Sequence, residues 1–200
     1  MDNYEISRER AKSYFLTYDQ EKIITRWNIP HDGDFFYVRF LNRPYRICRH
    51  TGDVVRLFDG AQAGFSEVLS IFDLLCHSGE ASFLTGEFAP VNSLRGRSAS
   101  VGVDADHSSK AASLFDRAPE RFRAACLGLG GVPIQMGDIG FRFPIFGEMQ
   151  AILKFYHSDE EFPASITLLW DENTLQYMYY ETVFYVAGFL IHEICKGMEK

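Results

Sequence analysis

Carboxylate side chains are concentrated in one stretch of the sequence, residues 155–183, where aromatic residues separate them. The acids of this stretch are Asp159, Glu160, Glu161, Asp171, Glu172 and Glu181. Two carboxylates that converge in space can form a general acid/base pair or bind a hard cation. On an extended chain Asp159 and Glu161 would face one side and Glu160 the other. A solvated turn followed by acids at a helix N-terminus is the ordinary alternative, and it is favoured.

Two predicted strands and a long helix would position these acids. Residues 149–157 and 164–171 are rich in β-prone residues. The link between them is too short for a crossover, so the strands should pair antiparallel. Asp171 would then lie at the end of the hairpin opposite Asp159. Glu181 opens the last predicted helix, where an acid suits the positive N-terminus, and it could lie beside Asp171.

A second chemical feature is a segment with five arginines and a single acid, Asp53. The arginines are Arg39, Arg43, Arg46, Arg49 and Arg56. Guanidinium groups bind carboxylates and phosphates, so the segment could hold an anionic ligand or an acidic partner, with Arg46 as the candidate binding residue. Pairing with acids in the C-terminal part of the same chain is the alternative, and it is favoured.

Three pairs of soft metal ligands also occur: Cys48 with His50, Cys76 with His77, and His192 with Cys195. Two such pairs brought together could bind zinc, and one histidine could ligate a haem. Buried thiols and incidental histidines are the favoured alternative. The glycine-rich run over 127–140 follows a predicted helix, whereas a phosphate-binding loop precedes one. It therefore indicates a helix stop and a flexible connection.

Composition limits the classes of function. The net charge of −7 argues against non-specific nucleic-acid binding. No run of apolar residues is long enough for a secretory signal or a membrane-spanning helix, so a cytoplasmic location with reduced cysteines is expected. The 18 Phe and 10 Tyr predict a large aromatic core or a pocket lined by rings.

The predicted elements come in blocks instead of alternating. Helices are expected to about residue 17 and over 19–27, 66–79, 108–118, 119–131 and 181–200, with Ser66 as an N-cap and a loop over 81–103. A β-meander is expected over 36–58, before the strand pair near the acids. This order predicts an α+β fold, a single domain with an antiparallel sheet and helices packed on it. The domain would span 1–200, with a core of about 19–195 and an N-terminal helix over 1–18.

Several segments resemble the DUF3786 family of uncharacterised proteins, found mainly in anaerobic bacteria and archaea. The similarity extends from about Glu21 to Glu193. The segments that show the similarity are "VRFLNRPYRI", "LSIFDLLCHSG", "LTGEFAPVNSL", "LGGVP" and "DEEFPASITLLWDENTLQYMYYET". The resemblance implies that the acidic turn, Asp171 and Glu181 share a role, but it implies no activity. Relatives often carry Thr where this chain has Tyr180. Some relatives are fused to an iron–sulfur domain like that of corrinoid proteins.

Three hypotheses of function follow. The first is a non-catalytic accessory domain that binds a small molecule or a protein partner in a ring-lined cleft beside the strand pair. Asp159, Glu161, Asp171 and Glu181 would orient the ligand. The second is an enzyme with a carboxylate centre, with or without a metal ion. The third is a tetrapyrrole or metal carrier. Its candidate ligands are His77, His157 and His192.

Overall fold

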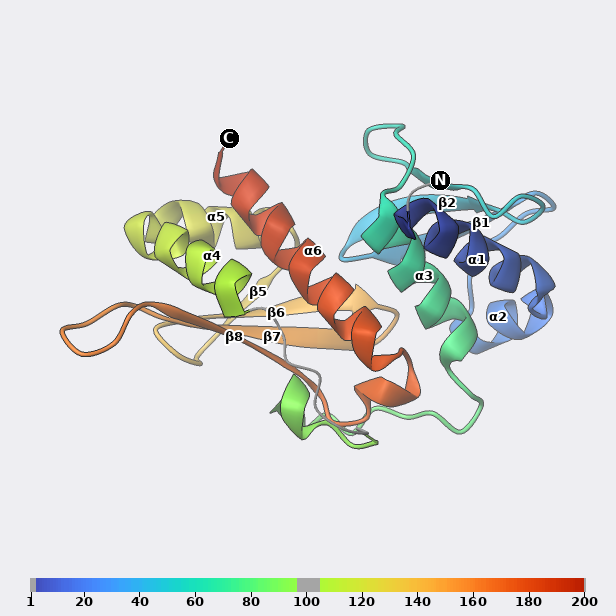
Figure 1. The fold of residues 1–200 in the computed structure, drawn as a ribbon. Coiled ribbons are helices and arrows are strands. Elements are labelled where there is room, and N and C mark those ends of the chain that lie inside the picture. Colours follow the sequence, from blue (N-terminus) through green and yellow to red (C-terminus); the bar gives the residue numbers. More distant parts are fainter. Residues whose placement is uncertain (1–2, 97–104, 200) are drawn as a thin grey trace.

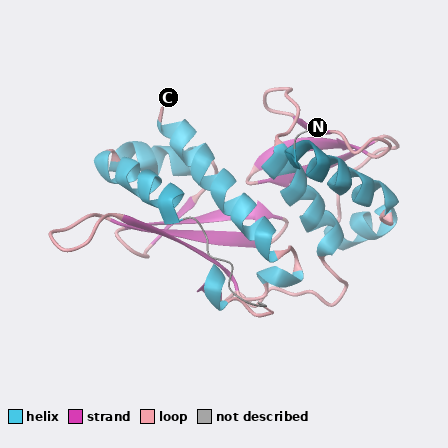
Figure 2. Ribbon diagram, viewed as in Figure 1, coloured by secondary structure: helices cyan, strands magenta, loops and turns pink. Residues whose placement is uncertain are grey.

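The computed structural model describes residues 3–96 and 105–199 (Figures 1 and 2). The helices in these residues are α1 (Asn3–Thr17), α2 (Gln20–Trp27), α3 (Phe65–His77), α4 (Ala105–Arg117), α5 (Pro119–Gly128) and α6 (Tyr180–Met198), with short 3₁₀ helices η1 (Val91–Ser93) and η2 (Thr174–Gln176). The strands are β1 (Phe35–Phe40), β2 (Arg43–Cys48), β3 (Val54–Arg56), β4 (Phe88–Pro90), β5 (Val132–Ile134), β6 (Ile139–Phe146), β7 (Met149–Tyr156) and β8 (Ser165–Asp171).

The first sheet is an antiparallel meander in the order β1-β2-β3. Alternate side chains of β1 are buried, as expected for a sheet with one covered face. The covering helices are α1 and α3. The ring of Phe15 in α1 is stacked on Phe72 of α3 at 4.6 Å and meets Phe36 of β1 edge-on at 6.0 Å. Aromatic packing of this kind holds the two helices on the meander.

The second sheet has the order β4-β8-β7-β6-β5, and all its pairings are antiparallel. Helices α4, α5 and α6 lie over one face of it (Figure 1). Phe115 of α4 and Phe122 of α5 are stacked at 4.3 Å, and both rings approach Phe155 of β7. The high Phe content therefore fills the interior, as the composition allowed.

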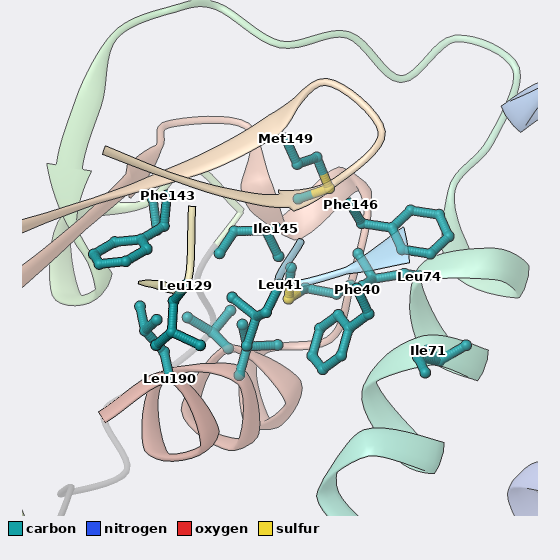
Figure 3. Packing of buried hydrophobic residues seen from close by; sticks show 14 of the residues in the cluster. Phe40, Leu41, Ile71, Leu74, Leu129, Phe143, Ile145, Phe146, Met149 and Leu190 are labelled. Atoms are coloured by element: carbon teal, nitrogen blue, oxygen red, sulfur yellow. The ribbon is translucent and has the colours of Figure 1, made fainter. Parts of the chain in front are cut away.

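Helix α6 and the β1–β2 turn join the two sheets. Helix α6 contacts α3, which covers the first sheet, and α5, which covers the second. The second link between the sheets is the turn residue Leu41. It is 3% exposed and donates its backbone N–H to the Ile145 carbonyl of β6 at 2.9 Å. Figure 3 shows Phe40 and Leu41 among Ile145, Phe146 and other apolar residues. The interior is one continuous apolar cluster.

The α+β class and the antiparallel pairing are confirmed, but the structure has two sheets where one was expected. Strand β4 lies in the predicted loop. Strand β5 lies within the glycine-rich run over 127–140, and β6 begins within it, where a flexible connection was expected. Ser66 is not the N-cap of α3, because the helix begins at Phe65 and its cap is Gly64. Glu67 supplies the missing polar partner by accepting the Gly64 N–H at 2.6 Å.

Candidate functional site

The acidic turn lies at the exposed tip of the β7–β8 hairpin. Asp159 Oδ1 accepts the backbone N–H groups of Glu161 and Phe162, at 2.8 and 2.7 Å. These two bonds lower the pKa of Asp159 below its usual 3.8. Glu160 and Glu161 are exposed. The Asp159 carboxylate therefore closes a local turn and is ionised at neutral pH. This arrangement agrees with the solvated turn that the sequence analysis favoured.

Asp171 is far from that tip. It ends β8, which begins at Ser165 beside the acidic turn, and six residues of strand at about 3.3 Å each separate these two positions by about 20 Å. Its carboxylate is 3% exposed. It accepts bonds from Thr85 N–H, Thr85 Oγ1, Gly86 N–H and Asn173 N–H, at 3.2, 3.2, 2.7 and 2.9 Å. Asp171 thus fastens the segment before β4 to the end of β8.

Glu181 is exposed in the first turn of α6 and acts electrostatically on Asp73 of α3. No interaction found within residues 3–96 and 105–199 joins Glu181 to Asp171. The structure therefore separates the predicted acids into three places: Asp159 with Glu160 and Glu161, Asp171, and Glu181. Their role in orienting a ligand stays a prediction.

Most of the arginines in the meander have partners in the chain itself. Arg56 bonds the buried carboxylate of Glu67 at 2.5 and 2.9 Å, and Arg43 pairs with Glu193 of α6. Arg49 is 3.5 Å from Glu21. Arg46 differs, because its guanidinium lies 4.4 Å from the Phe35 ring centre and forms no ion pair with a described residue. The proposal that it binds an anion stays open.

The soft-ligand pairs stay separate. Nowhere in the described part of the chain do three His, Cys, Asp or Glu side chains gather as a metal ion would require. His157 Nδ1 lies 2.7 Å from Asp116 of α4, and His50 is 3.2 Å from Asp34. Burial raises the pKa of the Cys76 thiol to about 12, so this thiol is protonated at neutral pH. In the described residues, no helix has the length and apolar character needed to cross a membrane.

A polar cluster that the sequence did not single out lies where α3 meets the start of α6. Asp73 Oδ2 accepts the Tyr179 N–H at 2.7 Å, so an α3 carboxylate holds the residue that precedes α6. One turn later in α3, His77 lies against the Tyr179 ring at 4.2 Å and reaches the Leu175 carbonyl at 3.3 Å. Burial raises the pKa of Asp73, against the effect of bonds from Thr182 and Tyr179. The sequence signal was an acid among the apolar residues of a helix, four residues before a histidine.

Beside this cluster is a groove of about 640 Å³ between α2 and the C-terminal end of α3. Ile23 and Leu75 are its buried apolar residues, and the ring of Tyr18 is half-buried at its side. Ser78 also lines it. This serine is 6% exposed, and its hydroxyl has no hydrogen-bond partner in the described residues. The groove has one ring, Tyr18, two aliphatic side chains and mostly polar or charged residues in its lining, and it lies between two helices and not beside the β7–β8 pair. The ring-lined cleft expected from the sequence stays a prediction.

The fold and the site together define an α+β protein whose described residues form a helix-lined groove. The chain belongs to the DUF3786 family, a domain of unknown function, whose model matches residues 19–193. The resemblance stated from the sequence segments is thereby confirmed. A search of curated proteins and a search of solved structures each gave no match.

Proposed function

We propose that this chain is an accessory domain that binds a small molecule in the groove between α2 and α3. The observation that carries the proposal is the Ser78 hydroxyl, which is buried at the groove without a hydrogen-bond partner in the described chain. A buried hydroxyl left unsatisfied costs about 1–3 kcal/mol. The oxygen has almost no accessible surface, so a polar atom of a bound molecule would satisfy it once the side chain rotates toward the groove.

The size of the groove supports the same proposal. Small-molecule sites usually have volumes of about 300–1,000 Å³, with mostly apolar walls and a few polar groups, and the groove of about 640 Å³ falls in this range. Ile23 and Leu75 supply apolar surface, and Ser78 supplies a polar anchor. The function would be binding, with no covalent chemistry required of the groove residues.

A neutral fluorescent probe tests the proposal. N-phenyl-1-naphthylamine should bind the purified protein saturably and brighten, because its rings would leave water for the surface of Tyr18, Ile23 and Leu75. Thr25 is exposed on α2 at the groove, so Thr25→Phe should fill the space and weaken probe binding. Ser113→Phe, at an exposed position of α4, is the matched control and should bind like the wild type. Equal binding by all three proteins, or no binding by the wild type, would overturn the proposal.

A second candidate function is acid–base chemistry at Asp73. The observation that favours it is the raised pKa of this half-buried carboxylate beside His77. Raised carboxylate pKa values are typical of general acids, although structural sites also show them. Asp73→Asn would abolish a reaction that needs this proton, while Asp159→Asn at the exposed hairpin tip would not. Loss with both variants, or with neither, would contradict the assignment.

A further inference from the structure

The charges around the groove indicate which class of molecule it binds. Lys22 and Arg26 both line it from α2, and residues four apart lie on the same side of a helix. The ammonium group of Lys22 has no ion-pair or hydrogen-bond partner among residues 3–96 and 105–199. Two cations one turn apart, neither in an ion pair with a carboxylate of the described residues, therefore lie on one wall of the groove.

Arg26 is held in position without a carboxylate. Its Nη2 donates to the Ser82 carbonyl at 3.0 Å, and its guanidinium carbon lies 5.5 Å from the centre of the Tyr177 ring. A carbonyl and a ring orient the guanidinium but leave its positive charge uncancelled. The remaining N–H groups can therefore donate to an anionic oxygen.

Two acids also line the groove, so its lining carries no net formal charge, but neither acid forms an ion pair with Lys22 or Arg26. Glu21 lines the groove, but its Oε1 lies 3.5 Å from Arg49 Nη2 on the meander side of α2. Glu80 follows the end of α3 and is exposed, where solvent screens its charge. The two cations of α2 are thus left available to an anion, and the apolar residues Ile23 and Leu75 lie beside them.

We propose that the groove binds an organic anion with a flat apolar body. Its carboxylate, sulfonate or phosphate oxygens contact Lys22 and Arg26. Its body lies against Tyr18 and Leu75, and the Ser78 hydroxyl, rotated toward the groove, forms a hydrogen bond with one of its polar atoms. This inference rests on the proposed function, because it names the class of ligand for the same groove.

A pair of probes separates the two claims. The anionic probe is 8-anilinonaphthalene-1-sulfonate, and the neutral probe is N-phenyl-1-naphthylamine, which has a similar ring system without the sulfonate. Lys22→Glu should raise the Kd of the anionic probe by about fivefold or more and leave that of the neutral probe unchanged. Lys196→Glu makes the same change at an exposed position near the C-terminal end of α6 and should affect neither probe. Added salt should weaken only the anionic probe.

Each outcome has one meaning. If Lys22→Glu leaves the anionic probe unchanged, or weakens both probes equally, the inference about charge is wrong. If the inference about charge fails but Thr25→Phe still weakens both probes, the proposed binding function of the groove stands without the anionic ligand. If neither probe binds the wild type, or Thr25→Phe has no effect on either, both the proposed function and the inference are overturned.

Discussion

The carboxylate of Glu67 is buried, and its hydrogen bonds come from other residues of the chain. It is 1% exposed, and it accepts hydrogen bonds from the Tyr45 hydroxyl at 2.6 Å and from Arg56 at 2.9 and 2.5 Å. Removing a charge from water is costly unless its lone pairs are satisfied. Here the Gly64 N–H completes the set. The residue therefore connects the meander to the start of α3.

Glu67→Gln should destabilise the fold strongly. The amide group would place N–H donors against Arg56 or Gly64 and would leave a guanidinium without its counter-charge. Breaking a buried ion pair costs about 3–5 kcal/mol, measurable by urea unfolding at neutral pH. Asp59→Asn removes the other acid near Arg56, which is 3.7 Å away and 40% exposed, and should cost about 1 kcal/mol or less. Equal losses for the two variants would contradict the role of burial.

The same residue predicts a pH dependence. Burial opposes ionisation of Glu67, but the bonds from Arg56, Tyr45 and Gly64 outweigh it and lower its pKa below 4.5. Stability from a lowered carboxyl pKa is present above the unfolded value and is lost as the pH falls through the folded value. The wild type should therefore lose its advantage over Glu67→Gln as the pH falls below about 4.5. A constant difference between the two from pH 7 to pH 3 would show that the charge is not involved.

Part of the residue-scale description could be predicted from sequence. The Asp19 cap of α2 follows from local rules, and its Oδ1 accepts the Glu21 and Lys22 N–H groups. The acids near the strand pair were identifiable by type, but their separation depends on the length of β8 and the path of the following loop. Asp73 was missed because its partners, Tyr179 and Thr182, are distant in sequence.

At the scale of elements, the stability contributed by the contact between α3 and the start of α6 should depend on pH in the direction opposite to that of Glu67. Burial raises the folded pKa of Asp73 above 3.8, so the ionised form destabilises the folded state. The stability of the wild type relative to Asp73→Asn should fall as the pH rises from about 4 through the folded pKa. Asparagine keeps a carbonyl that can accept the Tyr179 N–H. Denaturant unfolding between pH 4 and pH 7 measures the difference.

Glu181 provides the control for this prediction. Its charge raises the pKa of Asp73. Glu181→Gln should therefore move the pH range of the effect downward without removing it. Parallel stability curves for the wild type and Asp73→Asn would rule out a titration of Asp73 in this range.

The link between α5 and β5, in the first part of the glycine-rich run, is a close-packed junction. A Cβ on Gly131 would lie 2.7 Å from Phe143 Cε1 and 2.8 Å from the Cys126 carbonyl oxygen, whereas a Cβ on Gly128 would meet nothing within 4 Å. Gly131→Ala should therefore destabilise by about 1–3 kcal/mol, as overpacking does. Gly128→Ala, inside α5, should stabilise by about 0.5–1 kcal/mol. Thermal unfolding of both variants checks the pair, and changes of the same sign would be inconsistent with this packing.

Elements with strong local patterns were predictable, and those that depend on tertiary contact were not. The final helix and the β7–β8 hairpin follow from periodicity and a short link. Strand β6 contains Pro144, which usually argues against a central strand. The pairing shifts between Pro144 and Phe146, and this bulge accommodates the proline. Strand β4 has three residues and exists through its pairing with β8.

At the scale of the whole molecule, the two sheets should unfold together. The apolar cluster is continuous across them, and Trp27 of α2 packs edge-on against Phe146 of β6 at 4.8 Å. The only other tryptophan, Trp170, is 2% exposed in β8. Trp27 therefore reports on the junction between the sheets, and Trp170 reports on the interior of the second sheet.

Each tryptophan can be observed alone. Trp170→Phe leaves Trp27 as the reporter, and Trp27→Phe leaves Trp170. For each variant, the urea midpoint from tryptophan fluorescence should equal the midpoint from far-ultraviolet circular dichroism, since a shared core loses its packing in one cooperative step. The comparison is made within one variant, so a change in its total stability does not affect the test. A Trp27 transition at lower urea than the loss of helix signal would mean that the first sheet and its helices separate before the second sheet unfolds.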